Sequence, residues 1–353
     1  MKCSEYNSRK IRTLSFLASV GVVLLHTNPL ASATVGAEWL RNIGCFLSWF
    51  NIWCVPYFFL VSGFFFDRGR MGKSGGQFFW GKIKSLAIPY LLWGAVWGAL
   101  VWTPLWFLTN IKNGLPITTN TIFESTAIFS IIDRLFGVMR LSPANPTLWF
   151  VRMLMIIFAI SPVLWWFRRR AMPIFLLCSI AGICLLTPVA YVTPAEKLFK
   201  ITGFVFSVKL QAVAWFCLGM CMSAFKCDEK NLSVWTTIIL AAIAIVCMFY
   251  KWVAIYPLFA IAVIWKATDA IMRFVPQQLP LWMSMSFWIY CCHGPVSGWM
   301  KVIFKALFGT TPMGYAFSSA TMWFVTVCIC LASAYLCRRF LPKAYMVLSG
   351  GRG

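Results

Sequence analysis

The chain of 353 residues is 61% hydrophobic and 11% charged, and its formal net charge is +22. About a quarter of the residues of a soluble globular domain are charged, so this composition excludes an ordinary soluble fold and indicates a membrane protein. The excess of Lys and Arg does not indicate nucleic-acid binding, because these residues are spaced between apolar blocks and form no stripe along a phosphate backbone.

Apolar blocks long enough to cross a bilayer recur along the whole chain. A span needs about 20 predominantly apolar residues. Ten blocks qualify, at residues 13–30, 43–66, 86–108, 148–167, 172–190, 208–225, 232–249, 253–271, 281–300 and 319–336. We therefore expect an all-α fold, a polytopic bundle of about ten transmembrane helices over residues 1–345, followed by a short cytoplasmic tail at residues 346–353.

Basic residues set the expected orientation. With the N-terminus in the cytoplasm, most of the 31 Lys and Arg fall on the cytoplasmic side, as the positive-inside rule requires. Both termini are then cytoplasmic, and the longest connection, at residues 109–147, lies on the outer side. A competing interpretation is a cleaved signal peptide ending near Ala31, Ser32 and Ala33, which would leave nine spans and remove His26.

Cysteine is abundant, with fourteen residues, but no CxxC pair occurs and most cysteines lie inside apolar blocks. We interpret them as small hydrophobic residues rather than disulfide or metal ligands, and we expect no metal site.

Ionisable groups inside a span are costly and indicate a functional site. The chain has only two histidines, His26 and His293, and each lies about a dozen residues past the inner start of its span, or ~18 Å along the helix axis. Each alone has a plain explanation as a polar contact between helices, but a shared depth favours a common site. Arg152, near the outer end of its span, either snorkels to the interface or supplies a fixed positive charge to that site.

Five blocks, in the right order and over nearly the whole chain, resemble the acyltransferase 3 family of integral membrane proteins. They read FLASVGVVLLHTNP from Phe16, VPYFFLVSGFFF from Val55, KIKSLAIPYLLW from Lys82, LWFVRMLMIIFAISPVLWW from Leu148 and SFWIYCCHGPV from Ser286. The family's first-helix histidine corresponds to His26. An arginine that the family often places eleven positions earlier is replaced here by Ser15, and Arg12, one turn before it, is the candidate substitute.

The resemblance implies a multi-pass protein of the bacterial cytoplasmic membrane, with no bound cofactor, that takes an acyl group from acyl-CoA, commonly acetyl-CoA, in the cytoplasm. The implied acceptor is a hydroxyl of a cell-envelope sugar, polysaccharide or glycolipid. His26 would be the catalytic residue. We expect it to act as general base on the acceptor hydroxyl or to take the acyl group itself, with Arg152 or His293 stabilising developing charge. A basic cluster on the inner side would bind the phosphates of the donor, and its members are Arg12, Arg68, Arg70, Lys82 and Lys84.

Two other functions fit the same architecture. A transporter or flippase for a lipid-linked sugar would carry acidic residues at the membrane midplane, but no acidic residue lies well inside a predicted span, and Asp269 lies near an inner helix end. A non-catalytic membrane partner of a glycan-assembly machine would need neither histidine.

Overall fold

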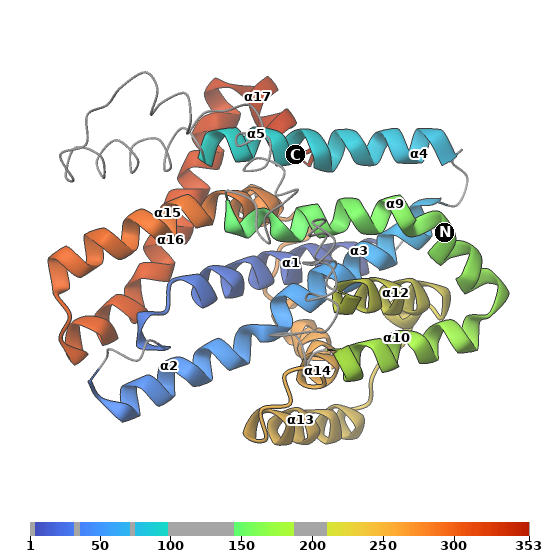
Figure 1. Cartoon of the computed structure of the whole chain (residues 1–353), viewed down its shortest axis with the longest axis horizontal. Helices are drawn as coiled ribbons and strands as arrows, with labels where there is room; N and C mark the ends of the chain where they lie inside the picture. Colours follow the sequence, from blue (N-terminus) through green and yellow to red (C-terminus); the bar gives the residue numbers. More distant parts are fainter. Residues whose placement is uncertain (1–3, 32–35, 71–74, 98–144, 187–209, 353) are drawn as a thin grey trace, which may run out of the picture.

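The computed structural model describes residues 4–31, 36–70, 75–97, 145–186 and 210–352, and in these residues the secondary structure is helical. The expected all-α class is thus confirmed. The α-helices are α1 (Glu5–His26), α2 (Glu38–Phe50), α3 (Cys54–Arg70), α4 (Gly75–Lys82), α5 (Ile88–Trp97), α9 (Trp149–Arg170), α10 (Met172–Leu186), α12 (Leu210–Ala224), α13 (Val234–Phe249), α14 (Tyr256–Ile271), α15 (Ser286–Phe308), α16 (Pro312–Phe340) and α17 (Pro342–Leu348). Most of them lie along one common direction (Figure 1).

Every one of the ten predicted spans overlaps at least one of these helices. Three helical runs are long and apolar enough to cross a membrane unaided: Glu38–Gly69, Trp149–Arg170 and Pro312–Phe340. Shorter apolar helices occur at Met172–Leu185, Leu210–Ala224 and Val234–Phe249. The number of ten spans and the side on which the termini lie stay predictions, and most of the long connection at 109–147 lies outside the described residues.

Helix α1 begins earlier than the first predicted span because its basic segment is helical too. The side-chain oxygen of Ser4 accepts a hydrogen bond from the backbone N–H of Asn7, and Glu5 follows in the first turn, where a negative charge favours the helix dipole. Arg9, Lys10 and Arg12 therefore project from a regular helix that continues directly to His26.

Helices α3 and α12 pack backbone to backbone at the centre of the bundle. A Cβ atom on Gly63 would collide with the carbonyl of Phe216, and one on Gly219 would collide with the carbonyl of Leu60. In a membrane the hydrophobic effect gives no drive for helices to associate, so close packing at small residues contributes much of the attraction. The two glycines thus fix the distance between α3 and α12.

Buried ion pairs hold together one end of the bundle, the end at which α1 begins and α3 and α9 finish, and which we name the basic end (Figure 1). Lys10 of α1 contacts Asp269 of α14 at 2.5 Å, and Arg168 of α9 contacts Asp67 of α3 at 2.6 Å. Arg68 contacts Asp228 at 2.7 Å. Each of these pairs joins segments distant in sequence, so part of the predicted positive-inside charge is neutralised by the chain's own carboxylates.

The wide turn between α4 and α5 is a π-helix at Ile83–Ala87. Pro89 follows it and has no N–H to donate to the carbonyl of Ser85 four residues earlier, which explains why the regular α-helical pattern fails there.

The Gly63–Gly219 contact generates a stability prediction. Gly63→Ala and Gly219→Ala should each lower the free energy of unfolding by about 1–3 kcal/mol, because neither backbone can move away without disturbing the other helix. Thermal unfolding of the purified protein in detergent measures the effect. Gly81→Ala is the matched control, since no atom lies near its Cβ position, and wild-type unfolding of both contact variants would contradict the packing.

The ion pair of Arg168 and Asp67 generates a second prediction. The Asp67 side chain is inaccessible and that of Arg168 is 11% exposed, so Asp67→Asn leaves a buried cation without its anion. We expect a loss of about 3–5 kcal/mol in unfolding free energy. Glu38→Gln, which breaks an exposed pair with Arg41 at 4.0 Å, should leave stability unchanged. Equal effects of the two substitutions would refute this account.

Candidate active site

The two histidines lie together where α1 ends, at the other end of that helix from the basic end. Helix α1 packs against α15, and the ring centroids of His26 and His293 are 5.2 Å apart with the rings inclined by 44°. The proximity agrees with the common depth predicted from sequence. His293 is fully buried, whereas His26, the last residue of α1, is accessible. The pair therefore combines one ring held inside the protein with one open to a ligand.

Hydrogen bonding fixes the tautomer of His293. Its Nδ1 lies 3.1 Å from the carbonyl oxygen of Ile289, and a carbonyl can only accept, so Nδ1 carries the proton. Nε2 then presents a lone pair, and it has no hydrogen-bond partner among the described residues. A buried acceptor without a partner is costly, which marks Nε2 as a place for a ligand, a water molecule or the N–H of His26.

Helix α15 contains a proline, Pro295, two residues after His293. Proline cannot donate to the carbonyl of Cys291, and the side-chain amide of Asn145 approaches that oxygen instead, at 3.4 Å. The hydroxyl of Tyr290 donates to the carbonyl of Thr147 in the same short segment. The segment before α9 thus clamps the turn of α15 that carries His293.

A cavity of about 540 Å³ runs between α1, α3, α9 and α15, and we name it the central cavity. Arg12 and Ser15 of α1 line it, together with Arg352 near the C-terminus. Tyr290 also lines it, and the ring of Tyr290 lies 5.9 Å from that of His293. The central cavity therefore reaches from arginines near the basic end to the neighbour of the histidine pair.

The predicted donor-binding residues separate into different places. Arg12 lines the central cavity. Arg68 does not, because it pairs with Asp228 and lies 4.4 Å over the ring of Phe64. Lys82 lies over the ring of Phe158 at 4.7 Å, and Lys84 over that of Trp80 at 5.7 Å. Arg70 ends α3, and its side chain lies outside the described part of the protein.

Arg152 lies near Tyr90, with which it interacts electrostatically, and Tyr90 in turn interacts with Tyr290. Arg152 is thus connected to His293 through two tyrosines, and no direct contact with either histidine occurs among the described residues. The cation that acts directly on His26 is Lys301, two turns after His293 on α15.

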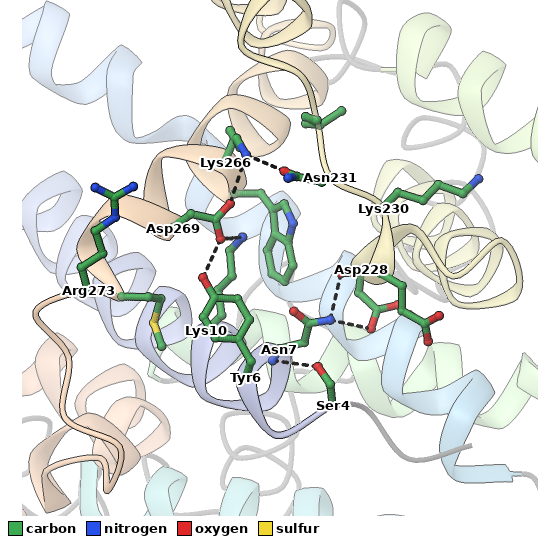
Figure 2. A pocket seen from close by; sticks show the side chains of 14 residues that line it. Ser4, Tyr6, Asn7, Lys10, Asp228, Lys230, Asn231, Lys266, Asp269 and Arg273 are labelled. Atoms are coloured by element: carbon green, nitrogen blue, oxygen red, sulfur yellow. Dashed lines mark hydrogen bonds and ion pairs between the residues drawn. The ribbon is translucent and has the colours of Figure 1, made fainter.

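A larger pocket, of about 730 Å³, lies at the basic end and has a different character (Figure 2). Its cations alternate with carboxylates: Lys10 and Lys266 both contact Asp269, at 2.5 and 3.6 Å, and the hydroxyl of Tyr6 donates to the same carboxylate. Asn7 donates to Asp228. Charges of both signs that pair with one another suit a contact that holds helices together. The larger volume of this pocket therefore does not make it the active site.

Four residues of the site were missed from sequence: Asn145, Tyr290, Lys301 and Arg352. For Asn145 and Tyr290 the sequence does contain a signal. Pro295 leaves the carbonyl of Cys291 without its helical N–H donor, so another donor is needed, and Tyr290 lies one turn before His293. Arg352 had none, since its position depends on how the C-terminal segment folds back.

The clamp on α15 makes a prediction that a double-mutant cycle can test. Asn145→Ala should destabilise the protein by about 1–3 kcal/mol, because it leaves the Cys291 carbonyl without a donor. In a Pro295→Ala background, residue 295 regains an N–H for that carbonyl, so the same substitution should cost about 1 kcal/mol less. Chemical unfolding in detergent gives the four stabilities. Strictly additive losses would contradict the clamp.

The sequence matches a known family and a characterised relative. Residues 11–339 match the acyltransferase domain family. The succinoglycan biosynthesis protein ExoH of Rhizobium meliloti (strain 1021) is 26% identical over 372 residues, which cover 98% of this chain and 92% of that protein. No solved structure matches. Because the family match spans most of the chain, including both histidines, the protein belongs to the acyltransferase domain family of membrane proteins.

Proposed function

We propose that the protein transfers an acyl group, which we expect to be acetyl, from cytoplasmic acyl-CoA to a hydroxyl of a cell-envelope polysaccharide or glycolipid. We expect this reaction to take place in the bacterial cytoplasmic membrane. The observation that carries the proposal is the histidine pair at 5.2 Å, approached by a cavity with arginines near its other end. The name of the ExoH relative supports a polysaccharide as the acceptor.

The chemistry needs a base for the acceptor hydroxyl. His26 is accessible and takes the proton as the hydroxyl oxygen attacks the thioester carbonyl. A C–O bond forms, the C–S bond breaks, and the proton passes to the departing thiolate to give free CoA. The basic form of imidazole is available near neutral pH, which suits His26 to both proton transfers.

His293 orients His26 in this proposal. Because Nδ1 of His293 donates to Ile289, its Nε2 can only accept. A ring separation of 5.2 Å brings a ring N–H of His26 within reach of that lone pair after a small side-chain rotation. The other nitrogen of His26 then faces the acceptor with its lone pair free. This role replaces the expectation that His293 stabilises negative charge, which a lone pair cannot do.

Lys301, which is exposed, supplies positive charge that acts on His26. A nearby cation favours the oxyanion that forms when the thioester carbonyl is attacked. Arg152, by contrast, acts electrostatically on Tyr90.

The transporter alternative receives little support from the described residues. The carboxylates of Asp67 and Asp269 lie near helix ends and are held in ion pairs with Arg168 and Lys10. Coupled transporters use ionisable residues near the midplane that can exchange their ion.

Substitution of His26 tests the proposal. His26→Ala should lower the rate of transfer by about 10² to 10⁴, the usual contribution of a general base. The assay uses purified protein in liposomes, radiolabelled acetyl-CoA and envelope glycan from a strain lacking the protein, and it measures label in the glycan together with free CoA. Transfer at the wild-type rate by His26→Ala would refute the proposal.

His293→Gln separates the two histidine roles. The glutamine carbonyl can still accept a hydrogen bond but cannot hold a proton, so an orienting role predicts a smaller loss than that of His26→Ala. A loss as large as that of His26→Ala, with unchanged thermal unfolding, would show instead that His293 itself carries the proton.

A further inference from the structure

The C-terminal segment folds back onto the bundle after α17. The backbone N–H of Gly350 donates to the carbonyl of Val347 at 3.1 Å, and that of Gly351 donates to Met346 at 2.8 Å. Both glycines have positive φ, +65° and +73°. This is the hydrogen-bond pattern of a glycine-terminated helix, and it reverses the chain so that Arg352 returns to the bundle.

The reversed segment is firmly attached. The indole N–H of Trp93 donates to the carbonyl of Leu348 at 3.1 Å, and Tyr345, only 2% exposed, stacks on Trp288 with centroids 5.3 Å apart. Gly350 lies so close to the carbonyl of Ser85 that a Cβ atom would not fit. These contacts therefore fix the backbone position of Arg352.

The Arg352 side chain enters the central cavity. Its guanidinium lies 4.2 Å over the ring of Phe287, and it lines the cavity together with Arg12. The surrounding protein lowers the pKa of Arg352 by desolvation, yet the side chain keeps accessible surface because it faces the cavity. An arginine stays protonated under these conditions, so the cavity contains a charge that protein atoms have partly desolvated.

The described lining of the cavity contains no carboxylate. Neither Arg12 nor Arg352 forms an ion pair with any described residue, in contrast to Lys10, Arg68 and Arg168, which each have an aspartate. Two guanidinium groups in one cavity with no anion among its described walls are suited to an anionic ligand, and phosphate is the anion whose geometry the guanidinium fork matches.

We propose that Arg352, acting with Arg12, binds the phosphate groups of the acyl-CoA donor and makes the C-terminal segment one wall of the donor site. This rests on the proposed function. Arg12 and His26 are fourteen residues apart on α1, or ~21 Å along its axis. The long pantetheine arm of CoA separates the phosphates from the thioester by a distance of the same order. Arg352 thereby supplies a second cation to the wall of the cavity that contains Ser15.

Binding of two probes to the full-length purified protein tests the assignment. Desulfo-CoA carries the phosphates without a thioester, and pantetheine carries the arm without phosphates. Arg352→Gln should weaken desulfo-CoA binding about tenfold or more, the effect of losing one charge-assisted contact, and leave pantetheine binding unchanged. Arg352→Lys should recover part of the loss, because an ammonium keeps the charge but not the fork. Calorimetry in detergent measures all the affinities.

Arg339→Gln is the matched control, because Arg339 ends α16 beside the ring of Phe340 and does not line the cavity. Gly350→Ala provides a second variant that leaves both arginines intact. It strains the reversal of the chain and should weaken desulfo-CoA binding by moving Arg352 away.

The outcomes are distinct. Equal desulfo-CoA affinity of wild type and Arg352→Gln would overturn the assignment, as would a parallel loss of pantetheine binding, which would mean that Arg352 only maintains the fold. If the anion were instead a lipid headgroup, Arg352→Gln would lower phosphatidylglycerol retention in mixed nanodiscs and leave desulfo-CoA binding unchanged. Absence of desulfo-CoA binding by the wild type would refute the acyl-CoA donor itself, and the assignment with it.

Discussion

A cation inside an apolar bundle must be compensated, and this requirement organises the whole structure. Lys10, Arg68 and Arg168 are compensated by aspartates of the chain. The resulting pairs connect α1 with α14, α3 with the segment after α12, and α9 with α3. Where the described walls supply no carboxylate, around the central cavity, a ligand can provide the negative charge. The cost of burying an unpaired charge therefore favours ion pairs between helices, and it makes the central cavity suited to an anion.

Helix α3 takes part in the central helix packing, in two of the three ion pairs and in the wall of the cavity. Its glycine packs against α12, its Asp67 and Arg68 form two of the buried pairs, and its Phe58 and Ser62 line the central cavity. The wall of the cavity is therefore rigid on that side. On the opposite side, α15 is shaped by Pro295 and depends on the clamp from Asn145 and Thr147. The central cavity thus lies between a rigid wall and a clamped one.

The helical class and the proximity of the two histidines were predictable because both follow from local quantities. Apolar length gives the helices, and a constant rise per residue gives the common depth of His26 and His293. The charge partners were not predictable in this way. Nothing near Arg68 in the sequence identifies Asp228, 160 positions away, as its partner. The same holds for Arg152, whose neighbour Tyr90 belongs to a separate helix, and for Arg352, whose location depends on a reversal of the chain.

The π-helix at Ile83–Ala87 has a consequence for how this region can evolve. It accommodates the missing N–H of Pro89 and sets the rotation of the helix that follows, from which Trp93 reaches the carbonyl of Leu348. Inserting or deleting one residue in this turn would rotate everything after it by about 100° and remove Trp93 from the C-terminal segment. Related sequences should therefore tolerate exchanged side chains in this stretch far better than any change in its length.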